Sequence, residues 1–231
     1  MRYLIIFFLI VNSSAEAADK ESLLIGGSQV SERNSYTYIG VLHPLNGSKI
    51  GDGWFSKVSA SWLTYEFDTF ANGGDVTAKA KVPGVDVGVG HAWTGANYSL
   101  SLGLSAGYRY INLSPNLPDE DNQGDTFTVT PDVQARYQFN PSLDADLISS
   151  YAFGQKTSFN RLRFGMHPNQ EWRIGLEATR VSGQNFMSRN LGIFASSYLS
   201  SGLGFEVSTG YSQDDNGKNS PYIGFGFAKF F

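Results

Sequence analysis

The chain of 231 residues has no cysteine, few charged residues and, beyond its first residues, no long apolar run. Without cysteine it can form no disulfide, no thiolate metal site and no lipid anchor on a cysteine. Only 16% of the residues are charged and the net charge is −4, which argues against nucleic acid as a partner. After the first residues, no segment approaches the roughly 20 apolar residues that a membrane-spanning helix needs.

The first 17 residues have the three-part pattern of a secretory signal peptide. A positive Arg2 precedes the apolar run of residues 3–11, and the A-x-A cleavage pattern stands at residues 15–17. The apolar run is too short to remain in a bilayer as a permanent helix. We therefore expect export and cleavage after Ala17 or Ala18.

Aromatic residues make up 14% of the chain, 26 residues are glycine, and the recurring pattern has period two. In residues 98–112 (YSLSLGLSAGYRYIN), one face carries Tyr, Leu and Ala and the other carries Ser, Gly and Arg109. Strands of soluble sandwiches usually run about 5–6 residues, whereas a tilted transmembrane strand needs roughly 9–11. This long alternation predicts the wall of a membrane barrel, apolar outside and polar inside.

Turn signals separate twelve such segments, so we predict an all-β fold, a transmembrane antiparallel β-barrel formed by residues 18–231. The expected strands are 22–31, 35–43, 54–67, 75–91, 97–113, 124–139, 142–154, 156–167, 170–183, 185–200, 202–214 and 220–231. An even number places both termini in the periplasm, where connections should be short. Because residues 43–53 form a long connection on that side, ten strands remain an alternative.

The ends of these strands predict the location and the lipid partners. The last strand ends in an aromatic residue, Phe231, which is the usual signal for the outer-membrane insertion machinery. Tryptophans 54, 62, 93 and 172 are candidates for the aromatic girdles at the membrane interfaces. We therefore expect an outer-membrane protein in contact with outer-membrane lipid and lipopolysaccharide.

A search for catalytic patterns favours a protein that is not an enzyme. None of His43, His91 and His167 stands in the His-x-Ser context of an outer-membrane hydrolase. The acidic loop Asp119–Asp125 matches half of a calcium loop, but the twelfth position, where a glutamate should stand, is Thr130. We expect a solvated loop, and we predict no catalytic, metal or cofactor site.

Charged residues on the predicted inner face are the candidate site. They are Arg109, Arg136, Asp144, Asp146, Arg161, Arg163, Arg173, Glu177 and Glu206. Cross-strand ion pairs that fill the interior are one interpretation, and a polar path for a hydrophilic substrate is the other. Residues 144–146 and 161–163 belong to neighbouring strands, so their charges are the first candidates for contact.

The order of several short motifs resembles the cellulose biosynthesis protein BcsS family over residues 22–231. The motifs are Ile25-Gly26-Gly27, Tyr36-Thr37-Tyr38, Gly51-Asp52-Gly53-Trp54, Trp62–Asp68, Tyr108–Pro115 and Gly210–Asp215. One departure is His167-Pro168-Asn169, where the family is associated with a Gly-Pro-Glu turn.

The resemblance implies an outer-membrane barrel in bacterial cellulose biosynthesis, with cellulose and other synthesis components as partners. As an export conduit or a surface anchor, the barrel would hold the glucan with aromatic rings and polar lumen groups. A small general porin or a structural barrel is the alternative, and a lipid-modifying enzyme is disfavoured by the histidine contexts.

Overall fold

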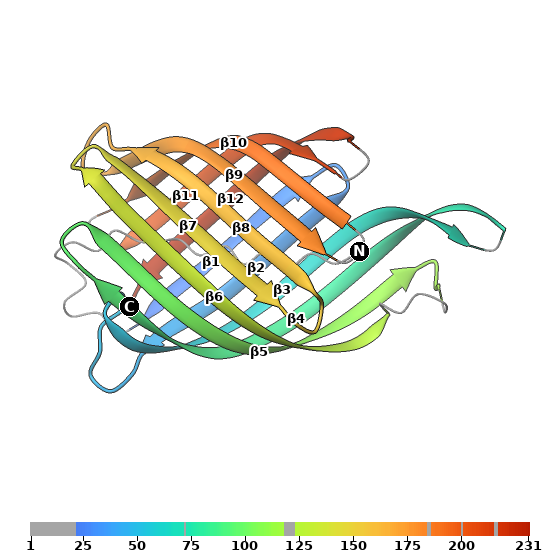
Figure 1. Ribbon diagram of the computed structural model, residues 1–231, viewed down its shortest axis with the longest axis horizontal. Coiled ribbons are helices and arrows are strands. Elements are labelled where there is room, and N and C mark those ends of the chain that lie inside the picture. The colour runs from blue at the N-terminus through green and yellow to red at the C-terminus, as the bar shows by residue number, and fades with distance from the viewer. Residues whose placement is uncertain (1–21, 72, 118–122, 184–185, 200, 215–216) are drawn as a thin grey trace.

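Twelve strands close into one antiparallel barrel in which each strand pairs with its neighbours in sequence and β1 pairs with β12 (Figure 1). The computed structural model describes residues 22–231 except 72, 118–122, 184–185, 200 and 215–216. The strands are β1 Leu23–Ser31, β2 Asn34–Pro44, β3 Gly53–Ala71, β4 Gly74–Thr94, β5 Tyr98–Ser114, β6 Gly124–Asn140, β7 Leu143–Ala152, β8 Thr157–Met166, β9 Trp172–Gly183, β10 Phe186–Tyr198, β11 Leu203–Gln213 and β12 Asn219–Phe230.

The predicted number of strands is confirmed at twelve, and the ten-strand alternative is wrong. The long connection before β3 holds an isolated bridge between Lys49 and Asp52, so it is a small hairpin of its own rather than a lost strand pair. The predicted cleavage position after Ala17 or Ala18 lies outside the described residues. Among the residues described, no helix is long and apolar enough to cross a membrane.

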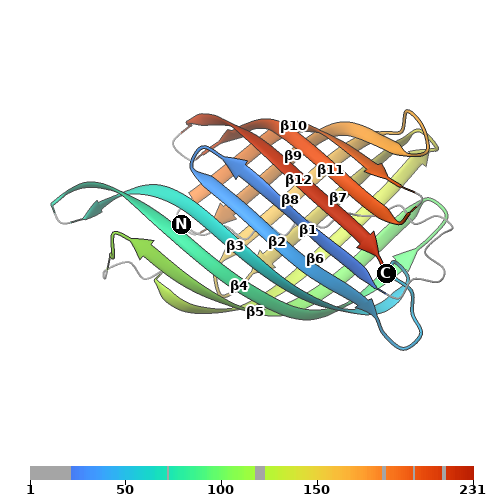
Figure 2. The same ribbon diagram turned by 180° about the vertical axis from the view of Figure 1, so that it is seen from behind.

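The barrel closes where the chain begins and ends. Leu23 pairs with Phe230, and the backbone N–H groups of Ser22 and Phe231 donate to each other's carbonyl oxygens at 3.0 Å. We call the barrel end that holds β1's start and β12's finish the terminus end (Figure 2). Closure leaves no sheet edge, which a spanning sheet requires because lipid cannot satisfy free backbone groups.

The alternation in β5 becomes the two faces of the wall. Leu102 and Leu104 point outward and are 47% and 52% exposed, whereas Ser105 and Arg109 point inward and are 4% and 2% exposed. An apolar outside and a polar inside are what a bilayer demands of a barrel strand. The structure therefore confirms which face of this segment meets lipid.

Toward the barrel end opposite the terminus end, the outer face of β3, β4 and β5 becomes polar and their inner face becomes apolar. On β4, Val85 and Val87 point outward, but further along the same outer face stand Lys79 and Lys81, opposed by a buried inner Ala80. The side chains still alternate between inward and outward, so only the residue types on the two faces change. This change indicates where the wall leaves the membrane, and the β3–β4 hairpin extends beyond the other strands (Figure 1).

On this extension, Arg33 donates two hydrogen bonds to Asp68, at 2.8 and 3.1 Å, and ties the β1–β2 turn to β3. The hydrogen bonds from Arg33 and Thr77 lower the pKa of the exposed Asp68 carboxyl to about 2. The pair is therefore ionised at neutral pH. Since a surface pair of this kind is worth at most about 1 kcal/mol, it orders the rim more than it stabilises the fold.

The tryptophans lie on the outer face, and three of the four are near the ends of strands, as expected for an aromatic girdle. Trp54, Trp93 and Trp172 stand at the terminus end, where β3 and β9 begin and β4 finishes, and Trp62 stands eight residues further along β3. His91 lies between two of them, with ring centroids 4.9 Å from Trp54 and 4.4 Å from Trp93. Its surroundings are those of an interfacial ring.

Candidate functional site: the lumen of the barrel

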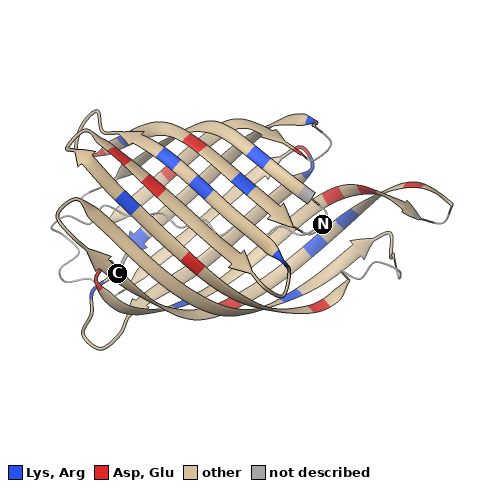
Figure 3. Cartoon of the chain, viewed as in Figure 1, with Lys and Arg blue, Asp and Glu red and all other residues tan. Residues whose placement is uncertain are grey.

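Eight of the nine predicted lumen residues form two adjoining groups of ion pairs on the inner wall, which together make up the ionic network. They are Arg136, Asp144, Asp146, Arg161, Arg163, Arg173, Glu177 and Glu206. Figure 3 shows positive and negative positions side by side on the neighbouring strands β6 to β9. The predicted contact between the charges of β7 and β8 is present, because Arg161 lies 3.8 Å from Asp146.

Asp144 is the centre of the network at the terminus end. Its carboxylate accepts hydrogen bonds from Arg136 and, at 2.5 Å, from Arg173. His167 Nε2, from the β8–β9 turn, lies 2.5 Å from Asp144 Oδ2. Arg173 also donates to Asp146 at 2.5 Å, which joins this centre to the next charge on β7. Side chains from β6, the β8–β9 turn and β9 therefore converge on one carboxylate of β7.

Arg163 is the second centre and connects β8 with β9 and β11. It donates to Glu177 at 2.6 Å and to both oxygens of Glu206 at 2.7 and 2.6 Å. The Tyr222 hydroxyl donates to Glu177 at 3.0 Å. A guanidinium held by two carboxylates in this way is oriented as well as neutralised.

Phe194 of β10 lies under this network. Its ring centroid is 4.5 Å from the Arg163 guanidinium carbon and 4.7 Å from that of Arg173. The negative face of an aromatic ring attracts a cation, so Phe194 joins the two centres without adding charge.

Two more ion pairs lie on the wall of β3 to β6. The ninth predicted residue, Arg109, donates to Asp86 at 2.6 Å, and Lys57 pairs with Asp132. Sequence reasoning missed Lys57, Asp86 and Asp132, and it also missed the place of His167. A signal was present for Lys57, because it shares strand parity with the inward residues of β3.

Positive and negative side chains on the inner faces of the described strands are equal in number. Six are basic (Lys57, Arg109, Arg136, Arg161, Arg163 and Arg173) and six are acidic (Asp86, Asp132, Asp144, Asp146, Glu177 and Glu206). Each lies within 4.0 Å of a partner of opposite sign. The lumen wall is therefore polar but carries no net charge.

Glycines leave room for these long side chains to lie along the wall. A Cβ on Gly84 would lie 2.3 Å from the Arg109 side chain, and one on Gly103 would lie 2.8 Å from Lys57 Nζ. Both glycines are inward-facing neighbours of the ion pairs they accommodate. The absence of a side chain at these positions thus allows the charges to reach their partners across the sheet.

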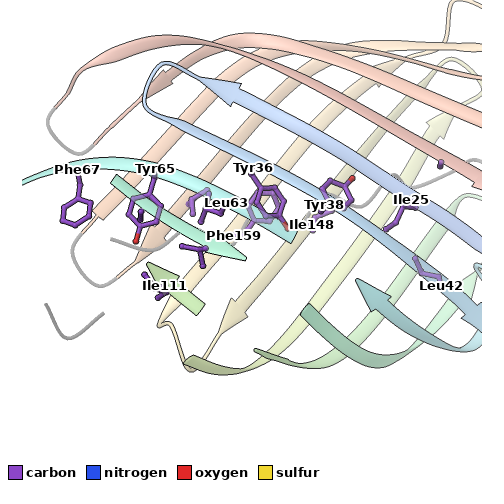
Figure 4. Packing of buried hydrophobic residues seen from close by; sticks show 14 of the residues in the cluster. Ile25, Tyr36, Tyr38, Leu42, Leu63, Tyr65, Phe67, Ile111, Ile148 and Phe159 are labelled. Atoms are coloured by element: carbon purple, nitrogen blue, oxygen red, sulfur yellow. The ribbon is translucent and has the colours of Figure 1, made fainter. Parts of the chain in front are cut away.

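Aromatic residues line the wall on the other side of the barrel, on β2 and β3. Figure 4 shows Phe67, Tyr65, Leu63, Tyr36 and Tyr38 one after another along the interior. Tyr36 and Tyr38 stack with centroids 5.8 Å apart, and Tyr65 and Phe67 lie 5.9 Å apart. In the closed order of strands, β2 stands six places from β8 in either direction. The row belongs to one buried cluster with Ile148, Phe159 and Val181 of the opposite wall, beside the ionic network.

The two walls meet at Tyr38. This ring, Arg161 and Glu206 line one cavity of about 10 Å³, which is room for about one water molecule. Residues from β1, β2, β8, β11 and β12 surround the cavity, so the contact crosses the interior rather than following one sheet face. Tyr38 therefore marks a narrow level of the lumen.

The remaining sequence candidates give no assembled catalytic site. His43 Nδ1 lies 2.9 Å from the Ser22 hydroxyl, and in the described part of the chain no carboxylate orients that histidine. Described His, Asp and Glu residues form no group of three that could hold a metal. Asp119–Asp121 of the acidic loop lie outside the described residues, and Asp125 accepts a hydrogen bond from the Tyr108 hydroxyl. The absence of enzymatic activity stays a prediction.

Several solved structures share this fold at low sequence identity. A KdgM porin in complex with disordered oligogalacturonate is 12% identical, with a TM-score of 0.57 over 90% of this chain and 99% of that chain. The COG4313 outer membrane channel from Pseudomonas putida F1 is 12% identical, with a TM-score of 0.56 over 92% and 96%. The transport unit of the autotransporter AIDA-I from Escherichia coli is 11% identical, with a TM-score of 0.55 over 96% and 93%.

These likenesses concern the fold alone, and they are to outer-membrane barrels. None of the curated proteins compared matches the sequence. The family model described as cellulose biosynthesis protein BcsS matches residues 23–231, which is every strand of the barrel. The chain therefore belongs to the cellulose biosynthesis protein BcsS family.

Proposed function

We propose that the barrel lies in the bacterial outer membrane, with both termini in the periplasm, and is a non-enzymatic conduit for the glucan of cellulose biosynthesis. The observation that carries the proposal is the aromatic row on β2 and β3, which meets a polar wall without net charge at Tyr38. A β-linked glucan presents flat faces of C–H groups and edges of hydroxyls. Aromatic rings complement the C–H faces, and the paired charges can donate hydrogen bonds to the hydroxyl groups and accept hydrogen bonds from them.

The equal numbers of charges support a neutral polymer over an acidic one. A wall with an excess of arginine would attract uronic acids, whereas six basic and six acidic side chains favour neither sign. A similar KdgM porin was solved with oligogalacturonate, so a barrel of this shape accepts an oligosaccharide. We expect this lumen to prefer a neutral oligosaccharide to oligogalacturonate.

Block of ion current by short β-1,4-glucans tests the proposal. The purified barrel in a planar bilayer should lose current when a neutral cello-oligosaccharide enters. The double variant Y36A/Y65A should need a concentration about 30-fold higher for equal block, on roughly 1 kcal/mol for each aromatic partner lost. Oligogalacturonate should block the wild-type protein less than the neutral sugar does.

The matched control is Y98A/Y137A, which removes two tyrosines from the outer face without touching the lumen. This variant should retain wild-type block. Conductance without block by any saccharide would favour a small general porin and would contradict the conduit proposal.

A surface anchor is the second candidate, and the β3–β5 extension favours it. Beyond Trp62, the inner face of the extension carries Leu63, Tyr65 and Phe67, so the aromatic row continues past the apolar band of the outer wall. An anchor would hold the glucan at this rim without passing it. In that case the short glucans would bind the protein but would leave the ion current unchanged.

Partners follow from the same proposal. Other components of cellulose synthesis would meet the barrel at its periplasmic end, which is the terminus end. Phe231 is exposed there and stands after the last strand, as a recognition residue for the insertion machinery should.

A further inference from the structure

Two arginines stand directly opposite each other on the outer wall. Arg180 of β9 pairs with Arg189 of β10 in the sheet register, and both side chains are exposed. Among the described residues, no carboxylate forms an ion pair with either of them. Like charges in directly opposed positions destabilise a sheet, so an anion bound between the two side chains would relieve the repulsion.

The position of the pair matches the edge of the membrane. Along this ladder, Trp172 marks the girdle at the terminus end, and Arg180 follows eight residues later. Eight residues at about 3.3 Å each, on a strand tilted by roughly 40°, rise about 20 Å, close to the ~25 Å apolar band of a barrel. The outward pairs between them are apolar, such as Leu176 with Ile193.

An apolar groove opens on the same outer wall below the arginines. It has a volume of about 820 Å³ and begins at Leu176 and Ile193, four residues from the charged pair. Phe164 of β8 and Val207 of β11 line it, and Ala195 of β10 contributes a small side chain between them. Since this surface faces lipid, the groove is shaped for acyl chains.

We propose that Arg180, Arg189 and the groove form a binding site for a phosphorylated lipid of the outer leaflet, namely lipopolysaccharide. A phosphate between the two guanidinium groups would accept paired hydrogen bonds and neutralise both charges. An acyl chain of the same molecule would run down the wall into the groove. With both termini in the periplasm, the arginines face the outer leaflet, where this lipid lies.

The charges also argue against a second copy of the chain as the occupant. A symmetric contact through this face would bring four arginines together, and no acidic side chain of the described outer wall lies beside them to offset the repulsion. The site rests on the outer-membrane location and orientation of the proposed function, but it does not depend on the conduit because it lies outside the lumen.

Lipid titration of the folded barrel tests the site. Wild-type protein in nanodiscs should bind phosphorylated lipid A more tightly than dephosphorylated lipid A or phosphatidylglycerol. The double variant R180Q/R189Q should bind phosphorylated lipid A about 25-fold more weakly, at roughly a fivefold loss for each arginine near anionic headgroups. The variant R180K/R189K keeps both charges but loses the paired guanidinium hydrogen bonds, so its affinity should lie between those of the wild type and R180Q/R189Q.

The matched control is K79Q/K81Q, which removes two exposed outward charges from the extension. It should bind as wild type does. A groove-filling variant, A195W, should lower affinity for the acylated lipid while leaving binding of a phosphorylated sugar headgroup unchanged. Folding of every variant is checked by its heat-dependent electrophoretic mobility. Unchanged affinity in R180Q/R189Q, an equal loss in K79Q/K81Q, or no preference for phosphate would overturn the proposal.

Discussion

Replacement of Tyr38 by alanine should raise the single-channel conductance of the barrel several-fold. Tyr38 lines the cavity of about 10 Å³ with Arg161 and Glu206, where the aromatic and ionic walls meet. Removing the phenol ring widens this level, whereas the charges that face it stay held by their own partners on the wall. Recording of purified, refolded protein in a planar bilayer measures the change.

The control for Tyr38 is Tyr211, a tyrosine of the outer face that is 67% exposed. The Y211A variant should conduct as the wild-type protein does, because its ring lies outside the lumen. Equal conductance of Y38A and wild type would show that the ring does not limit the path. A rise in Y211A as large as in Y38A would point to general loosening of the barrel instead.

Arg163→Ala should be among the most destabilising single substitutions in the lumen. The arginine is the partner of both Glu177 and Glu206, and the three side chains are at most 8% exposed. Its loss leaves two carboxylates without their counter-charge, which costs about 3–5 kcal/mol when a buried pair is broken in this way. Denaturant titration of the barrel in lipid vesicles measures the free energy of unfolding.

Two comparisons separate this effect from the general cost of a mutation. R33A removes the exposed pair with Asp68 and should cost less than about 1 kcal/mol. The triple variant R163M/E177Q/E206Q removes charge from all three partners and should recover much of the stability lost in R163A. A cost for R163A no greater than that of R33A would contradict the role assigned to the network.

The sequence predicted the strands well because a transmembrane wall must alternate. Residues 98–112 alternate without interruption, since a lipid face and a lumen face meet at every step along β5. The end of β3 was predicted four residues short, at 67 instead of Ala71, whereas the start of β4 was predicted within one residue of Gly74. Past the membrane the demand for an apolar outer face ends, so the pattern that marks a strand reverses.

That reversal also explains why the aromatic wall was not predicted. In β2, Tyr36 and Tyr38 alternate with Thr37 and Ile39, so both faces contain apolar side chains and period two cannot choose between them. Only the pairing with β1 and β3 in the closed barrel turns the tyrosines inward. Their relation to the ionic wall depends on closure, which no local pattern contains.

The ionic network was predicted in part for a related reason. Arg161 and Asp146 lie on adjacent strands, so alternation and strand order were enough to place them together. Lys57 reaches Asp132 from β3 to β6, across two strands, which is possible only because Gly88 and Gly103 carry no side chain. A contact of that length follows from the barrel's curvature and from glycines on strands that are distant in sequence.

The most direct test of the proposed conduit is the location of glucan in a producing strain that lacks this protein. If the barrel passes the polymer, deletion should abolish glucan at the cell surface and leave newly made glucan in the periplasm, and the wild-type gene should restore export. If the barrel only anchors the polymer, its deletion should instead release glucan into the medium. Unchanged surface glucan in the deletion strain would contradict the account.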